Sequence, residues 1–93
     1  MANKYEYVKR SIDKRKRFVD GLKENPCERC GKSFHPCAMQ WHHKDPSIKK
    51  FSIGRGLYRQ SMKAIKEEIR KCVLYCANCH AIVEYELRHD VKI

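Results

Sequence analysis

The chain lacks any long apolar run. No stretch of its 93 residues comes near the roughly 20 consecutive apolar residues that a membrane-spanning helix needs. The opening segment, MANKYEYVKR, is charged and lacks the apolar centre of a secretory signal peptide. We therefore expect no membrane association and a reducing, cytoplasmic location. In that compartment, paired Cys-x-x-Cys motifs are more often metal sites than disulfides.

Acidic residues are also scarce. The chain has 21 Lys and Arg residues against 11 Asp and Glu residues, which gives a formal net charge of +10. Two segments, 1–21 and 44–71, carry this excess, whereas the segments that hold the cysteine pairs are close to neutral. A polyanion such as nucleic acid is the expected partner, and a merely solubilising surface is the alternative.

No internal repeat or low-complexity tract is present, so hydrophobic periodicity indicates the secondary structure. Asn25-Pro26 ends a basic amphipathic helix, and Ser61 is a candidate helix cap. The expected elements are helices over 4–23, 61–72 and 78–88, short strands over 38–43 and 72–75, and a turn-rich basic loop over 44–56. The side chains expected on the inner side of the last helix are Cys79, Ile82, Val83, Glu86 and Leu87. This order predicts an α+β fold, with a basic helix in 1–26 and the rest of one compact domain in 27–93.

Two Cys-x-x-Cys pairs are present, with 45 residues between them. Each pair places two thiolates on one side of a tight turn, and two pairs complete a tetrahedral S4 site that suits Zn2+. The residues of this expected structural zinc site are Cys27, Cys30, Cys76 and Cys79. A redox role would need a thioredoxin-like βαβ pattern, which the sequence lacks. The remaining cysteines, Cys37 and Cys72, are expected to be small buried residues.

The histidines suggest a second site. His42 and His43 are adjacent at the end of an expected strand, whereas His35 and His89 are expected to be ordinary surface or core residues. His80 and Glu84 are four residues apart, so they share a helix face that differs from the face of Cys79. An imidazole and a carboxylate are suitable ligands for a divalent metal with open positions. The alternative is a set of unrelated histidines and a solvated glutamate.

These motifs resemble a known family. WHHKDP, followed by CVLYCANCHAIVEYE, is similar to the small HNH endonucleases, the His-Me finger proteins with the ββα-metal fold. The resemblance covers about residues 27–87 and implies a phage-type member with a four-cysteine zinc site. It further implies a metal-dependent endonuclease or nickase that acts on DNA in a bacterial host or a phage-infected cell.

The resemblance also implies roles for single residues. His42 and His80 match metal-ligand positions, and His43 matches the general base. Glu84 falls where some members have another metal-binding histidine, and a carboxylate there favours harder ions. The implied catalytic ion is one divalent metal: Mg2+, Mn2+, Zn2+ or Ni2+. Lys71 departs from the family, because it stands where an asparagine usually supports the loop of the base; it is expected to support this loop differently or to contact a phosphate.

Basic residues between the two expected strands can line a groove for the DNA backbone. They are Lys44, Lys49, Lys50, Arg55, Arg59, Lys63 and Lys66. Gly54 and Gly56 would allow close approach to a phosphate. In the first helix, Lys14, Arg15, Lys16 and Arg17 either contact DNA or form a solvated face. Trp41 is expected in the core.

The resulting hypothesis is a single-metal DNA endonuclease with a histidine base. The alternative is a zinc-stabilised DNA-binding or accessory protein of a phage DNA-packaging complex, with weak or no cleavage. A binding module has no need of a basic imidazole beside an open metal position, so His43 and His80 favour the first hypothesis. Lys71 is the main argument for the second.

Overall fold

The computed structural model describes residues 4–89, so the ends of the expected ranges 1–26 and 27–93 lie outside the described part. Within it, the protein is a small α+β fold with four α-helices and a two-stranded antiparallel sheet. The elements are α1 (Lys4–Leu22), β1 (Met39–His43), α2 (Ile53–Arg59), α3 (Met62–Ile69), β2 (Cys72–Cys76) and α4 (Ala77–His89), with short 3-10 turns at Pro36–Ala38 and Pro46–Ile48.

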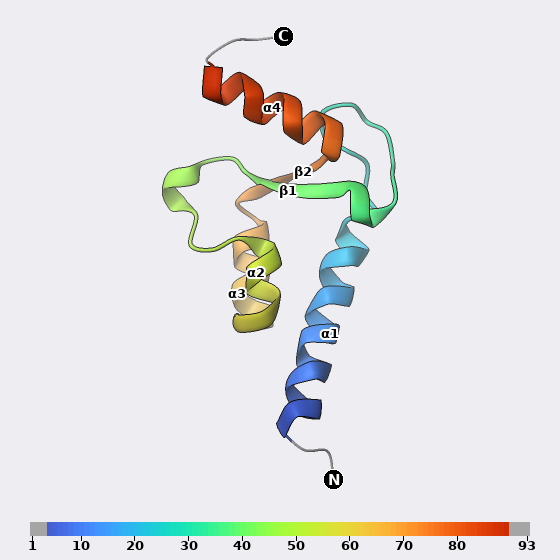
Figure 1. Ribbon diagram of the computed structural model, residues 1–93, viewed down its shortest axis with the longest axis vertical. Coiled ribbons are helices and arrows are strands. Elements are labelled where there is room, and N and C mark those ends of the chain that lie inside the picture. The colour runs from blue at the N-terminus through green and yellow to red at the C-terminus, as the bar shows by residue number, and fades with distance from the viewer. Residues whose placement is uncertain (1–3, 90–93) are drawn as a thin grey trace.

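The sheet separates two layers of helices. α4 lies along one side of β1 and β2, and α1, α2 and α3 lie on the other side (Figure 1). The register pairs Met39 with Cys76 and His43 with Cys72. Because successive side chains of a strand point to opposite faces, His42 and His43 belong to different faces of this sheet.

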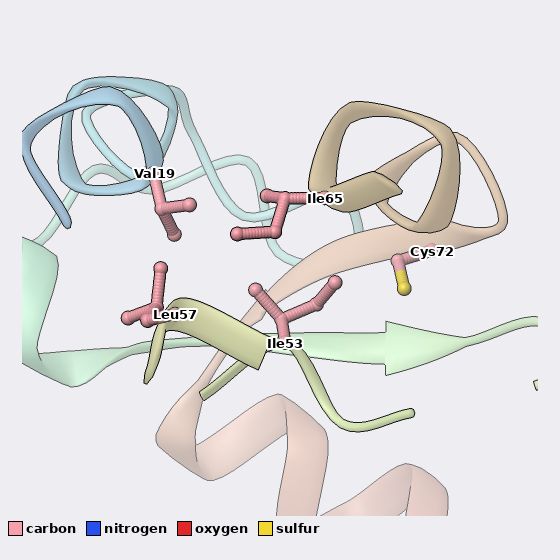
Figure 2. Packing of buried hydrophobic residues seen from close by; sticks show 5 residues of the cluster. All are labelled: Val19, Ile53, Leu57, Ile65 and Cys72. Atoms are coloured by element: carbon pink, nitrogen blue, oxygen red, sulfur yellow. The ribbon is translucent and has the colours of Figure 1, made fainter. Parts of the chain in front are cut away.

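The helical layer closes over a compact apolar cluster. In Figure 2, Val19 of α1, Ile53 and Leu57 of α2, and Ile65 of α3 converge, with Cys72 of β2 at the edge. Val19 and Ile65 are almost completely buried. The C-terminal half of α1 is therefore packed against α2 and α3, whereas Tyr5 near its start is 75% exposed.

A second buried cluster surrounds the cysteine pairs. Its members are Cys27, Met39, Leu74, Cys76 and Cys79. Three of these five residues belong to the Cys-x-x-Cys pairs, so thiols replace much of the aliphatic volume that normally stabilises a domain. Trp41 packs against both clusters and is only partly buried, and its Nε1 has no hydrogen-bond partner among residues 4–89.

Most of the expected elements are confirmed, with small shifts at their ends. Ser61 caps α3, because its Oγ accepts a hydrogen bond of 3.1 Å from the backbone N–H of Ala64. The expected loop over 44–56 is wrong in part, because α2 begins at Ile53 and buries an apolar face. Its two glycines and short length of 7 residues conceal the helical pattern.

Two burial predictions are wrong. Leu87 is 64% exposed, because it lies near the end of α4, beyond the sheet that covers the start of the helix. Cys37 is exposed in the 3-10 turn before β1, whereas Cys72 is buried as expected. Across the described helices, none has both the length and the apolar character required to cross a membrane.

Candidate metal centres

The four cysteines of the two Cys-x-x-Cys pairs meet in space. One ligand atom from each of Cys27, Cys30, Cys76 and Cys79 lies within 4.8 Å of every other, and the Cys30 and Cys76 sulfurs are 4.0 Å apart. Four sulfurs bound to one zinc ion at 2.3 Å lie about 3.8 Å from one another in a tetrahedron. The cluster is therefore able to hold a metal ion such as zinc with little movement.

Backbone hydrogen bonds shape the first Cys-x-x-Cys pair into a tight turn. The N–H of Gly31 donates to the carbonyl of Cys27 at 2.8 Å, and the N–H of Cys27 donates to Lys32 at 2.9 Å. Gly31 has a φ of +75°, a conformation that favours glycine. The N–H of Glu28 donates to the carbonyl of Leu74 at 2.9 Å, which attaches this turn to β2.

The second pair is formed where β2 passes directly into α4. Cys76 ends the strand, and Cys79 lies in the first turn of the helix. The backbone N–H of Cys79 donates to the sulfur of Cys76 at 3.4 Å. The turn that holds Cys27 and Cys30, the end of β2 and the start of α4 therefore meet at the same cluster of sulfurs.

Two of the four thiols, Cys27 and Cys79, have pKa values shifted in opposite directions. Burial opposes ionisation of Cys27, but backbone N–H groups of Cys30, Cys76 and Arg29 outweigh it and lower its pKa to about 6. Burial raises the pKa of Cys79 to about 12, although the guanidinium of Arg29 donates to its sulfur at 3.6 Å. A bound cation would remove this penalty, because it stabilises all the thiolates together.

A second cluster joins β1 to α4. One ligand atom from each of His42, His80 and Glu84 lies within 4.8 Å of the others. Glu84 Oε1 is 3.1 Å from His42 Nδ1 and 3.5 Å from His80 Nε2. Ligand atoms that share one ion at about 2.1 Å are roughly 3.0–3.4 Å apart. The donor set thus fits one divalent ion, and the same distances also fit hydrogen bonds between the side chains.

This second cluster is open to solvent. Glu84 is 40% exposed and His80 is 26% exposed, whereas His42 is 12% exposed. An open cleft of about 480 Å³ runs past the cluster; it is lined by Trp41, His42, His43, Pro46, Lys49, His80, Glu84, Leu87 and Arg88. The ring of Tyr75 lies 5.4 Å from the ring of His42 and supports it from the sheet. Three protein ligands beside a cleft leave coordination positions for other molecules.

His43 has a different environment from His42. Its Nε2 lies 2.8 Å from Glu68 Oε2, and its side chain is 9% exposed. Glu68 is almost completely buried, and its Oε2 also accepts the backbone N–H of Lys50 at 3.0 Å. Burial opposes ionisation of Glu68, but Lys71, the N–H of Lys50 and His43 outweigh it and lower its pKa to about 2.

Lys71 points into the protein. Its Nζ donates to Glu68 Oε1 at 2.8 Å and to the backbone carbonyl of Ile48 at 3.0 Å. The first bond holds α3 and the second holds the segment after β1, so Lys71 supports this segment by contacts inside the protein. Of the two expectations for Lys71, this geometry favours loop support over a phosphate contact.

Sequence reasoning missed Glu68. The position of Glu68 was the available signal: it is three residues after the buried Ile65 on α3, so it adjoins the apolar face of this helix. An acidic residue beside a buried face needs a hydrogen-bonding partner, and His43 at the end of β1 is one such partner.

The basic residues expected to contact DNA are mostly exposed. The exposed members are Lys14, Lys16, Arg17, Lys44, Lys49, Lys50, Arg55, Arg59, Lys63 and Lys66. Arg15 is partly buried, and its Nε donates to the carbonyl of Leu57 at 2.8 Å, which fastens α1 to α2. The Nζ of Lys66 lies 5.1 Å from the ring centre of Phe18. Their contact with DNA stays a prediction.

The two glycines expected near a phosphate differ. Gly54 has open space where a Cβ would be, but a Cβ on Gly56 would lie 2.5 Å from the ring of Phe51. Gly56 is buried and is required for packing of Phe51 on α2. It is therefore not available for close approach to a phosphate.

No protein-family model matches the chain, and neither a curated protein nor a solved structure gives a match. The interpretation of the site therefore rests on the residues and their geometry.

Proposed function

We propose that the protein is a metal-dependent DNA endonuclease or nickase of the HNH type, with a ββα-metal finger formed by β1, β2 and α4. The observation that carries the proposal is the meeting of His42, His80 and Glu84 at an open cleft that His43 also lines. The four-cysteine cluster is then a structural zinc site that holds the start of α4 against the sheet.

In this proposal, His42, His80 and Glu84 hold one divalent metal. An ion held by these three side chains would supply Lewis-acid polarisation of the scissile phosphate and stabilisation of the leaving oxygen. The ligands come from both sides of the β1–α4 contact, so packing of α4 on the sheet brings them together. Glu84 supplies the negative charge that favours Mg2+ or Mn2+.

His43 acts as the general base. It is adjacent to the ligand His42 and lines the same cleft, where it accepts a proton from the attacking water. Lys49 lines this cleft too, and it offers a cation to the DNA backbone. The exposed basic residues of 44–66 extend this positive surface, so binding depends on phosphates and has low sequence specificity.

A nicking assay tests the proposal. Supercoiled plasmid is incubated with zinc-loaded protein and a series of divalent metals, and the wild type is compared with His43→Ala. We expect metal-dependent nicking by the wild type and a loss of about 10²–10⁴-fold in the variant, because a general base contributes about that much. Zinc content and DNA affinity should stay unchanged, as measured by metal analysis and fluorescence anisotropy.

The matched control is His35→Ala, because His35 is exposed in the turn before β1. It should nick plasmid at the wild-type rate. Equal nicking by His43→Ala and the wild type would remove His43 as the base. DNA binding without cleavage in any metal would instead support the second candidate, a zinc-stabilised DNA-binding or accessory protein of a phage DNA-packaging complex.

A further inference from the structure

We infer that Glu68 is a positioning residue that holds the proton of His43 on Nε2 and leaves Nδ1 as the only nitrogen able to accept a proton. The inference rests on the proposed function for its consequence in catalysis. Its structural part, the tautomer of His43, concerns the folded protein alone and is testable without DNA.

The first step is the chemistry of the contact. Glu68 Oε2 lies 2.8 Å from His43 Nε2, which is a charge-assisted hydrogen-bond distance. An ionised carboxylate has only acceptor atoms, so the hydrogen of this bond must belong to the imidazole. In neutral histidine only one ring nitrogen carries hydrogen; with Nε2 protonated, Nδ1 has a free lone pair.

The second step is that Glu68 stays a carboxylate. Its two oxygens receive the ammonium of Lys71 at 2.8 Å, the backbone N–H of Lys50 at 3.0 Å and the imidazole of His43. The ammonium and the backbone N–H are able only to donate, and both are directed at a group that is almost completely buried. A protonated Glu68 would leave the ammonium of Lys71 without the negative charge that it faces at 2.8 Å inside the protein, which costs free energy.

The third step is rigidity. The donors to Glu68 come from three parts of the chain: the end of β1, the segment before α2, and the turn between α3 and β2. Lys71 also donates to the carbonyl of Ile48 at 3.0 Å, so the same network holds the segment between β1 and α2. The ring of His43 is thus fixed in orientation as well as in tautomer. No residue of the described part 4–89 hydrogen-bonds its Nδ1.

The consequence for the reaction is a defined proton acceptor. Water gives its proton to Nδ1, and the imidazolium that forms keeps its Nε2–H bond to Glu68. The negative charge of Glu68 then stabilises this cation. A carboxylate that orients a histidine base has the same role in serine proteases, where replacement by the amide imposes the wrong tautomer.

The first experiment reads the tautomer by NMR. Zinc-loaded wild-type protein with 15N-labelled histidine is measured at a pH where the imidazoles are neutral. Long-range correlations between ring protons and ring nitrogens should assign the hydrogen of His43 to Nε2. A hydrogen on Nδ1, or an even mixture of tautomers, would overturn the inference, whether or not the protein cuts DNA.

The second experiment compares Glu68→Gln with Glu67→Gln. The amide keeps the shape of Glu68 but turns a donor toward either His43 or Lys71, so we expect the His43 tautomer to become mixed or inverted. Glu67 is exposed on the same helix, so the same chemical change there should leave the tautomer intact. An unchanged Nε2–H tautomer in folded Glu68→Gln would overturn the inference.

Nicking kinetics provide the functional measurement. We expect Glu68→Gln to lower kcat by about 10²-fold or more with KM within about threefold, because the buried carboxylate orients the base and is remote from the DNA surface. Should Glu68→Gln fail to fold, the wild-type tautomer still decides the inference. A wild type with the Nε2–H tautomer but no cleavage would refute the proposed nuclease and leave the positioning contact established.

Discussion

The four-cysteine cluster and the His42–His80–Glu84 cluster adjoin each other but differ in nearly every physical respect. The first is formed by four soft thiols, three of them buried, that come from a turn, a strand end and a helix start. The second consists of two imidazoles and a carboxylate that remain partly exposed beside a cleft. A site whose ligands are all protein atoms stabilises a fold, whereas a site with open positions is suited to bind and activate other molecules.

Disruption of the four-cysteine cluster should therefore unfold the protein. Cys76→Ser removes the ligand that joins β2 to α4, and a structural zinc ion contributes about 10–16 kcal/mol, as much as the whole stability of a small domain. We expect loss of the folded state, measured as loss of near-ultraviolet circular dichroism and of a cooperative thermal transition. Chelation of zinc should have the same effect on the wild type.

Cys37→Ser is the matched control. Cys37 is exposed and lies outside the cluster, so its thermal midpoint and zinc content should equal those of the wild type. A Cys76→Ser protein that loses zinc yet melts at the wild-type temperature would contradict this expectation, because it would show that the four-cysteine cluster has no structural role.

Disruption of the His42–His80–Glu84 cluster should abolish binding of a divalent ion there and leave the protein folded. His80 is partly exposed on α4, so His80→Ala should keep zinc and a thermal midpoint close to that of the wild type. It should lose binding of a second divalent ion, because only two ligands remain. Titration with Co2+ distinguishes the two sites, since thiolate and imidazole ligands give different visible absorption.

His89→Ala serves as the control on the same helix. His89 is exposed and its ring contacts Tyr85, apart from the metal ligands. It should bind the second ion normally. If His80→Ala still binds the second ion with wild-type affinity, the geometric cluster is only a set of hydrogen-bonded side chains.

A smaller effect is expected from Arg29, which donates to the Cys79 sulfur at 3.6 Å and pairs with Glu86 at 4.0 Å. A ZnS4 site carries net negative charge, and a guanidinium beside it offsets this charge. Arg29→Ala should weaken zinc retention roughly tenfold, as changes next to metal ligands do. Competition with a chromophoric chelator measures it.

Lys32→Ala is the control for this last comparison, because Lys32 is exposed in the same turn and contributes its backbone carbonyl. Its zinc retention should be unchanged. Equal retention in both variants would show that the charge of Arg29 has no influence on the sulfur cluster.

The sequence predicted these clusters better than it predicted their surroundings. Cys-x-x-Cys pairs and the His80–Glu84 spacing are local patterns, and local spacing determines which side chains share a turn or a helix face. The expected helix of α1 and both strands are also confirmed, because helical spacing, alternation and a short apolar run are local patterns too. The proximity of His42 to α4 required the resemblance to a family, since no spacing within either element predicts it.

The buried network around Glu68 was not predictable in the same way. It joins residues 18 and 25 positions apart, and its formation depends on how α3 and the segment before α2 pack against the end of β1. Likewise α2 was hidden, because Gly54 and Gly56 lower helix propensity while burial of Ile53 and Leu57 overrides it. Tertiary packing decides both cases.

Cys79 and His80 are consecutive residues in the first part of α4, and each belongs to a different cluster. An ion in the sulfur cluster would restrict the backbone that also carries an imidazole ligand, so two bound ions would not act independently. Thermodynamic linkage requires this influence to be mutual. If the first ion changes the affinity for the second by some factor, the second changes the affinity for the first by the same factor. The peptide bond between these two residues would then be the shortest route by which occupancy of one site could influence the other.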